Sequence, residues 1–102
     1  MMTKKEMEQI ARIRAMERHL DHASQAVMRL SAALDDYVEA QEALHELETY
    51  YGSDLWKQDF ADDEAGRLPA DLKRGVLSED GIWNLLEDSR SLDQRIKEIA
   101  AS

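Results

Sequence analysis

Four acidic residues just past the middle of this 102-residue chain have side chains that could bind a divalent cation: Asp59, Asp62, Asp63 and Glu64. An EF-hand calcium loop that begins at Asp59 would need an oxygen ligand at its third position and a glycine at its sixth. The sequence has Ala61 and Glu64 there, so the template fails at both positions. We therefore favour a solvated acidic turn or local ion pairs, and we predict no metal site.

The histidines and serines offer other spacings that could support chemistry. Glu42 and His45 have the spacing of one half of a carboxylate-bridged di-iron site, but such a site needs a second copy of the motif, which the chain lacks. His19 and His22 stand three residues apart on a charged segment, where exposed histidines are ordinary. No serine lies in a G-x-S-x-G elbow, and no glycine-rich phosphate loop occurs. We predict no catalytic residue and no cofactor, and therefore a protein that is not an enzyme.

The negative charge of the chain is concentrated in its middle. The chain carries 22 acidic and 13 basic side chains, a net charge of −9 at pH 7. Residues 1–29 carry +2, residues 30–71 carry −10 and residues 72–102 carry −1. Because an acidic surface repels phosphate backbones and attracts cations, this distribution argues against nucleic-acid binding and favours a basic protein partner.

The composition also indicates whether the chain is folded and where the protein is located. No run approaches the roughly 18 consecutive apolar residues of a membrane span, and the first ten residues lack the apolar core of a signal peptide. The chain has no cysteine, and its hydrophobic share of 43% argues against disorder. We expect a folded, soluble, cytoplasmic protein with no membrane partner.

The elements that must position these residues are predicted to be helices. All four glycines and the only proline fall between Gly52 and Gly81, which divides the chain into helix, connector and helix. From Ile13 onward, ten of the twelve heptad a and d positions are apolar or aromatic. This pattern predicts a long amphipathic helix over residues 3–51, capped by Thr3 and roughly 70 Å long, with a bend near residues 35–36, where two aspartates stand together.

The remaining residues predict a connector over residues 52–78 and a C-terminal helix over residues 79–100. Ser53 is the expected cap of a short helix over residues 54–61, which places Trp56 and Phe60 on one face. Ser78 is the expected cap of the C-terminal helix. We predict an all-α fold and a single domain over residues 1–102. We expect the connector to be ordered and the C-terminal helix to pack back as an antiparallel hairpin or small bundle.

The connector carries an uncommon series of residue types in order: Tyr50 to Ser53, Trp56, Asp59, Asp63, Glu64, Gly66, Leu68, Pro69, Asp71 to Lys73, and Gly75 to Ile82. With these positions, the run from Tyr50 to Leu86 closely resembles the signature of a bacterial family known as domain of unknown function 4298. The resemblance implies a small, stand-alone bacterial protein. It supplies no activity.

Part of the long helix has an apolar stripe with no evident cover. The C-terminal helix is less than half as long as the first, so the stripe lacks a partner in its own chain other than the connector. We name as the apolar stripe the residues Ile10, Ile13, Met16, Leu20, Val27 and Leu30. A second copy of the chain is the simplest partner, which predicts a coiled-coil homodimer and leaves parallel and antiparallel association open.

The connector is the best candidate for recognition of a partner. Its candidate residues are aromatic or charged: Trp56, Asp59, Asp62, Asp63, Glu64, Arg67, Lys73 and Arg74. The same residues would also suit a folded segment that packs on the helices. We predict a non-enzymatic protein–protein interaction module that acts through its acidic middle and its aromatic connector. The alternative is a small-molecule-binding or catalytic domain with a site between the connector, around Trp56, and the helices.

Overall fold

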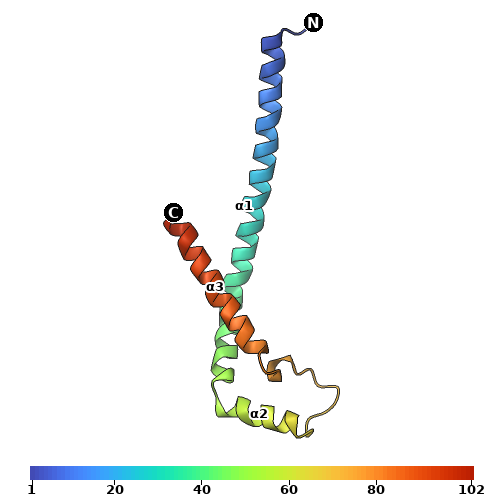
Figure 1. Cartoon of the computed structure of the whole chain (residues 1–102), viewed down its shortest axis with the longest axis vertical. Helices are drawn as coiled ribbons and strands as arrows, with labels where there is room; N and C mark the ends of the chain where they lie inside the picture. The colour runs from blue at the N-terminus through green and yellow to red at the C-terminus, as the bar shows by residue number, and fades with distance from the viewer. The chain divides into compact units, whose positions relative to one another are not determined.

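The computed structural model describes residues 1–102 and contains helices but no strands (Figure 1). In chain order the elements are α1 (Lys4–Tyr51), α2 (Asp54–Glu64), the one-turn 3-10 helix η1 (Gly75–Leu77) and α3 (Gly81–Ala101). The predicted all-α fold, with a long first helix, a connector containing a short helix and a C-terminal helix, is confirmed. No helix has a segment long and apolar enough to span a membrane.

The chain divides into two compact units, which we call the N-terminal unit (Met1–Ala40) and the C-terminal unit (Gln41–Ser102). The boundary falls within α1. The helix is assigned without interruption through Asp35 and Asp36, so these two poor helix formers do not end it. A bend at that point stays a prediction.

The N-terminal unit is a helical segment with its apolar residues uncovered. The helix begins as predicted, because the hydroxyl of Thr3 accepts a hydrogen bond from the backbone N–H of Glu6 at 3.1 Å. Nothing in α1 is fully buried. Ile10 in the apolar stripe is half-buried, whereas its other five residues are each more than half exposed, from 51% at Ile13 to 67% at Val27.

Local capping explains where α2 begins and ends. The hydroxyl of Ser53 accepts a hydrogen bond from the backbone N–H of Trp56, as predicted. At the other end, Gly66 adopts a φ of 72°, and the N–H groups of Gly66 and Arg67 bond to the carbonyls of Asp63 and Asp62. This is a Schellman motif, which needs a left-handed residue that glycine supplies without strain. The helix therefore continues to Glu64, three residues beyond the predicted end.

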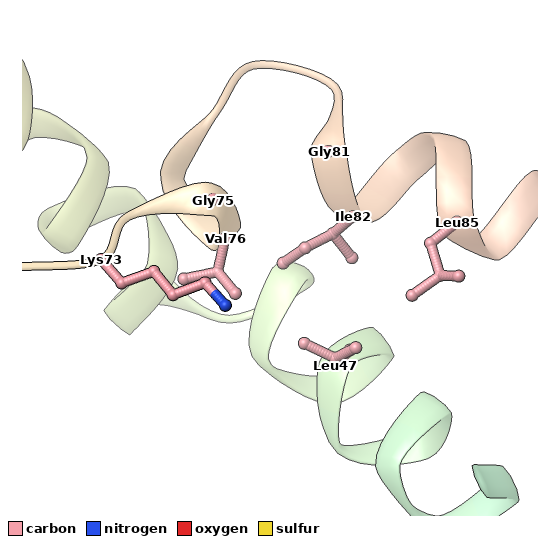
Figure 2. Close-up of a pocket in the computed structure, with 7 residues that line it drawn as sticks. All are labelled: Leu47, Lys73, Gly75, Val76, Gly81, Ile82 and Leu85. Carbon is pink, nitrogen blue, oxygen red and sulfur yellow. The ribbon is translucent and has the colours of Figure 1, made fainter.

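The core lies in the C-terminal unit and is small. It consists of Leu77 from η1 and of Ile82 and Leu86 from α3. Leu47 of α1 lies across from Ile82 in Figure 2, so the last turns of α1 and the first turns of α3 are neighbours. The burial of Leu77 and Ile82 agrees with their position on either side of the predicted start of α3.

The start of α3 differs from its prediction. The helix begins at Gly81 rather than at residue 79, because Ser78 takes part in two turns at once. Its hydroxyl donates to the Gly75 carbonyl at 2.7 Å and accepts from the Gly81 N–H at 3.1 Å. A Cβ at residue 81 would lie 2.7 Å from the Gly75 carbonyl oxygen and would also collide with the Ser78 hydroxyl, so this close approach requires glycine.

Because the core is small, the free energy of unfolding should depend strongly on each of its residues. Ile82 is 3% exposed and Ile99, on the same helix, is 69% exposed. We expect Ile82→Ala to lower the free energy of unfolding by about 2 to 5 kcal/mol, because it leaves a cavity in the core. The matched variant Ile99→Ala should change it by less than about 0.5 kcal/mol. Urea denaturation followed by circular dichroism at one protein concentration measures both, and equal effects would contradict this description of the core.

Candidate functional site

The connector is held by a group of aromatic side chains around Trp56. The indole N–H of Trp56 donates to the backbone carbonyl of Val76 at 2.9 Å. Its ring meets Tyr51 edge to face, with centroids 4.9 Å apart, and stacks on Phe60 at 5.2 Å. We call Tyr51, Trp56, Phe60 and the Val76 carbonyl the aromatic clip. It joins the end of α1, the face of α2 and η1, so the connector is ordered, as predicted.

A second contact joins α1 to α2 beside the clip. The hydroxyl of Tyr50 donates to a carboxylate oxygen of Asp59 at 2.6 Å. This hydrogen bond, with burial and the negative charge of Asp59, raises the pKa of Tyr50 from 10.0 to about 12. The contact stabilises the protonated hydroxyl, so Tyr50 is a structural donor at neutral pH and not an activated base.

Two ion pairs fix the segment after α2. Arg67 pairs with Asp62 at 3.1 Å, and Arg74 pairs with Asp63 at 2.5 Å. The guanidinium of Arg74 also donates to the backbone carbonyl of Pro69 at 2.6 Å. Because Arg74 bonds to both a side chain of α2 and the loop backbone, it holds the loop against the C-terminal end of that helix.

The structure therefore gives internal contacts to six of the eight predicted partner-binding residues, namely Trp56, Asp59, Asp62, Asp63, Arg67 and Arg74. The other two, Glu64 and Lys73, are exposed and take part in no ion pair. The folded-segment interpretation accounts for the six. Recognition of a partner by this surface stays a prediction.

The residues whose spacing resembles that of metal ligands do not converge in the structure. No group of three or more histidine, aspartate or glutamate side chains converges in an arrangement that could hold a metal ion. His45 lines a surface hollow of about 230 Å³ together with Glu48 and with Arg90 and Asp93 of α3, and Glu42 is not part of it. Glu42 and His45 are three residues apart on α1, and no third histidine or carboxylate side chain joins them in such a group.

A larger hollow, of about 410 Å³, lies between η1, the start of α3 and the last turns of α1 (Figure 2). We call it the η1 hollow, and its lining residues are Leu47, Lys73, Gly75, Val76, Gly81, Ile82 and Leu85. The side chains are apolar except for Lys73. Of these residues the sequence singled out only Lys73 as a site residue. The others come from three separate elements, and no local signal could show that they meet.

The helices, the aromatic clip and the ion pairs define an all-helical protein whose connector is a folded structural element. The chain matches the family described as "Domain of unknown function (DUF4298)" over residues 13–99 and belongs to it. The resemblance found in the sequence is therefore confirmed, and the match includes most of α1 and of α3 as well as the connector. No curated protein and no solved structure matches the chain.

The contact between Tyr50 and Asp59 predicts a dependence on alkaline pH. Since the pKa of Tyr50 is raised on folding, its contribution to stability is complete below pH 10 and is lost as the pH rises through about 12. We expect Asp59→Asn to lower the pKa of Tyr50 toward 10 by removing the charged acceptor.

The ultraviolet absorbance of tyrosinate measures this shift, once the titration of Tyr50→Phe has been subtracted to isolate Tyr50. The control is Asp62→Asn, which neutralises a carboxylate that pairs with Arg67 and should leave the pKa of Tyr50 unchanged. An unchanged titration in Asp59→Asn would show that the hydrogen bond does not set this pKa.

Proposed function

We propose that this protein is a non-enzymatic protein–protein interaction module that works as a homodimer, joined through the apolar stripe of α1. The observation that supports this most directly is the exposure of the stripe. Ile13, Met16, Leu20, Val27 and Leu30 repeat on one face of one helix, and each is more than half exposed in the single chain. Scattered exposed apolar residues are normal, but a continuous row on one helix face is typical of an interface.

Burial of the apolar stripe is also favoured energetically. Full burial of one large aliphatic side chain contributes roughly 1.5 to 3 kcal/mol, and proteins of this size have little stability to spare. The core buries only Leu77, Ile82 and Leu86, all in the C-terminal unit. A second copy that covers the stripe would add a comparable apolar interface on the N-terminal unit.

The acidic middle plays a smaller part in the proposal than its charge suggests. Asp59, Asp62 and Asp63 are engaged within the chain, so they are not free to bind a partner without losing internal contacts. Exposed carboxylates such as Asp35, Asp36 and Glu39 of α1 are the part of this region left to attract a cationic surface. A basic protein partner stays a prediction from charge.

If the protein is a homodimer, one substitution in the apolar stripe should halve the mass measured in solution. Light scattering at micromolar concentration should give twice the mass of one chain for the unmodified protein. Leu20→Glu should give the mass of one chain, because it places a charge in the apolar interface. Leu55→Glu is the matched control, since Leu55 is 67% exposed, similar to the 59% of Leu20, but lies on α2. A single-chain mass for the unmodified protein would overturn the proposal.

A second candidate function, the binding of a small molecule, is favoured by the η1 hollow. The hollow lies between the connector and the helices, its walls are apolar, and its one charged member, Lys73, makes no ion pair. An apolar body with an anionic end group is the ligand chemistry that such a surface would bind. Trp56 does not line the hollow, because its ring is engaged in the aromatic clip.

Decanoate, an apolar carboxylate, is a suitable probe of this second function. At millimolar concentration it should shift the amide resonances of Gly75, Val76 and Gly81, and Lys73→Gln should weaken the shifts by removing the cation. Lys57→Gln is the control, because Lys57 lies on α2 outside the hollow and stands 4.0 Å from Asp54. Shifts that are absent from these residues, or that are unaffected by Lys73→Gln, would exclude this site.

A further inference from the structure

We infer that the two copies associate in antiparallel fashion through residues 13–37 of α1, with Leu20 of one copy beside Leu30 of the partner subunit. The inference rests on the proposed homodimer and adds to it the direction and the register of the helices. Three features of α1 support it: the extent of its apolar positions, the sizes of the side chains that would face each other, and the distribution of charge along it.

The apolar core positions of α1 have clear limits in the N-terminal unit and at its boundary. They occupy consecutive a and d positions of one heptad register: Ile13, Met16, Leu20, Ala23, Val27, Leu30, Leu34 and Tyr37. The same register places a polar residue on either side, Gln9 before the series and Gln41 after it. A helix that packs on this series should therefore cover residues 13–37 and bring polar residues together at the ends.

In an antiparallel pair, one register covers residues 13–37 and also brings the flanking polar residues together. Position a then faces position d, so Leu20 lies beside Leu30 of the partner subunit and Met16 lies beside Leu34 of the partner subunit. In the same register Gln9 reaches the position of Gln41 of the partner subunit, a residue that also lines the hollow beside α3 of its own chain. A shift of one heptad in one direction would set Gln9 against Leu34 of the partner subunit, and the opposite shift would set Met16 against Gln41 of the partner subunit. Either shift would place a polar side chain against an apolar one in the core.

The sizes of the facing side chains also distinguish antiparallel from parallel association. In a parallel pair each residue faces its own copy, so the small Ala23 would face Ala23 of the partner subunit and the large Tyr37 would face Tyr37 of the partner subunit. In the antiparallel register Ala23 lies beside Val27 of the partner subunit, and the volumes of the layers are more even. Even filling favours the antiparallel pair, because protein interiors pack with few voids.

The flanking positions allow the two helices to approach closely at the centre of this register. The g positions of the heptad in this part of α1 include Ala26 and Ala33. At the centre of the antiparallel pair, Ala26 lies close to Ala26 of the partner subunit, where no long side chain would hold the helices apart.

The distribution of charge along α1 also favours antiparallel association, but by a smaller amount. Residues 1–20 carry five basic and three acidic side chains, a net charge of +2, whereas residues 21–40 carry one basic and four acidic side chains, a net charge of −3. Antiparallel association sets unlike halves together and parallel association sets like halves together. A parallel pair could form a contact between Arg12 and Glu17 of the partner subunit, but exposed ion pairs of this kind contribute little.

Cysteine cross-linking distinguishes the two directions without background, because the chain has no cysteine of its own. Full-length Leu20→Cys and Leu30→Cys are prepared separately, and light scattering under reducing conditions checks that each is still a dimer. They are then oxidised alone and after subunit exchange. We expect the mixed disulfide to exceed either homodisulfide at least about tenfold, since paired thiols react at a high effective concentration.

The pair Ala23→Cys with Val27→Cys tests the same register with smaller changes in volume, and it replaces the first pair if Leu20→Cys or Leu30→Cys is no longer a dimer. Two control mixtures test the shifted registers: Ile13→Cys with Leu30→Cys, and Val27→Cys with Leu30→Cys.

Homodisulfides in the single variants would show a parallel pair and overturn the inference while the homodimer stands. A dominant disulfide in either control mixture would overturn the register. A single-chain mass for the unmodified protein would instead overturn the proposed homodimer itself.

Discussion

The hydrogen bond from the indole of Trp56 to the Val76 carbonyl is the contact on which the C-terminal unit depends, because it joins two elements that are 20 residues apart. It holds η1 against α2, and η1 carries Leu77 into the core beside Ile82. The rings of Tyr51 and Phe60 pack on the same indole. Between α2 and η1 the chain forms no further helix, so the clip, together with the two ion pairs of Arg67 and Arg74, must offset the conformational freedom that the loop loses on ordering.

Because only three residues are buried in the core, polar contacts also join the elements of the C-terminal unit. The bond between Tyr50 and Asp59 holds α2 to the end of α1, and the pair of Arg74 with Asp63 holds the loop to α2. Charged groups that partly leave water need partners, and these carboxylates have them within the chain. The acidity of the connector is therefore in large part structural. This is why the uncovered apolar face of α1, rather than the acidic run, carries the proposed function.

Local signals in the sequence predicted the elements well. The caps at Thr3 and Ser53 form the expected hydrogen bonds, and α1 ends at Tyr51, directly before Gly52, the first glycine of the chain. The predicted end of α2 at residue 61 was three residues short, because the helix continues until Gly66 adopts a left-handed conformation just beyond it. The contacts that define the site could not be predicted. Tyr50 meets Asp59 only after a turn in the chain, and the lining of the η1 hollow depends on the path of the whole connector.

The apolar residues of α1 belong to two different surfaces. Near the end of the helix, Leu44, Leu47 and Tyr50 are half-buried in the C-terminal unit, where α3 and the connector lie beside them. Only Leu44 of these three is at an a or d position of the heptad, whereas in the N-terminal unit a and d residues such as Leu20 and Val27 stay exposed. A helix needed only to hold the clip could end its apolar face where that contact ends. The match to the family begins at residue 13, the first a position of the series, and extends through the connector. The exposed a and d positions thus lie in the same family domain as the clip, so the proposed association would be a property of the whole domain and not of an added segment.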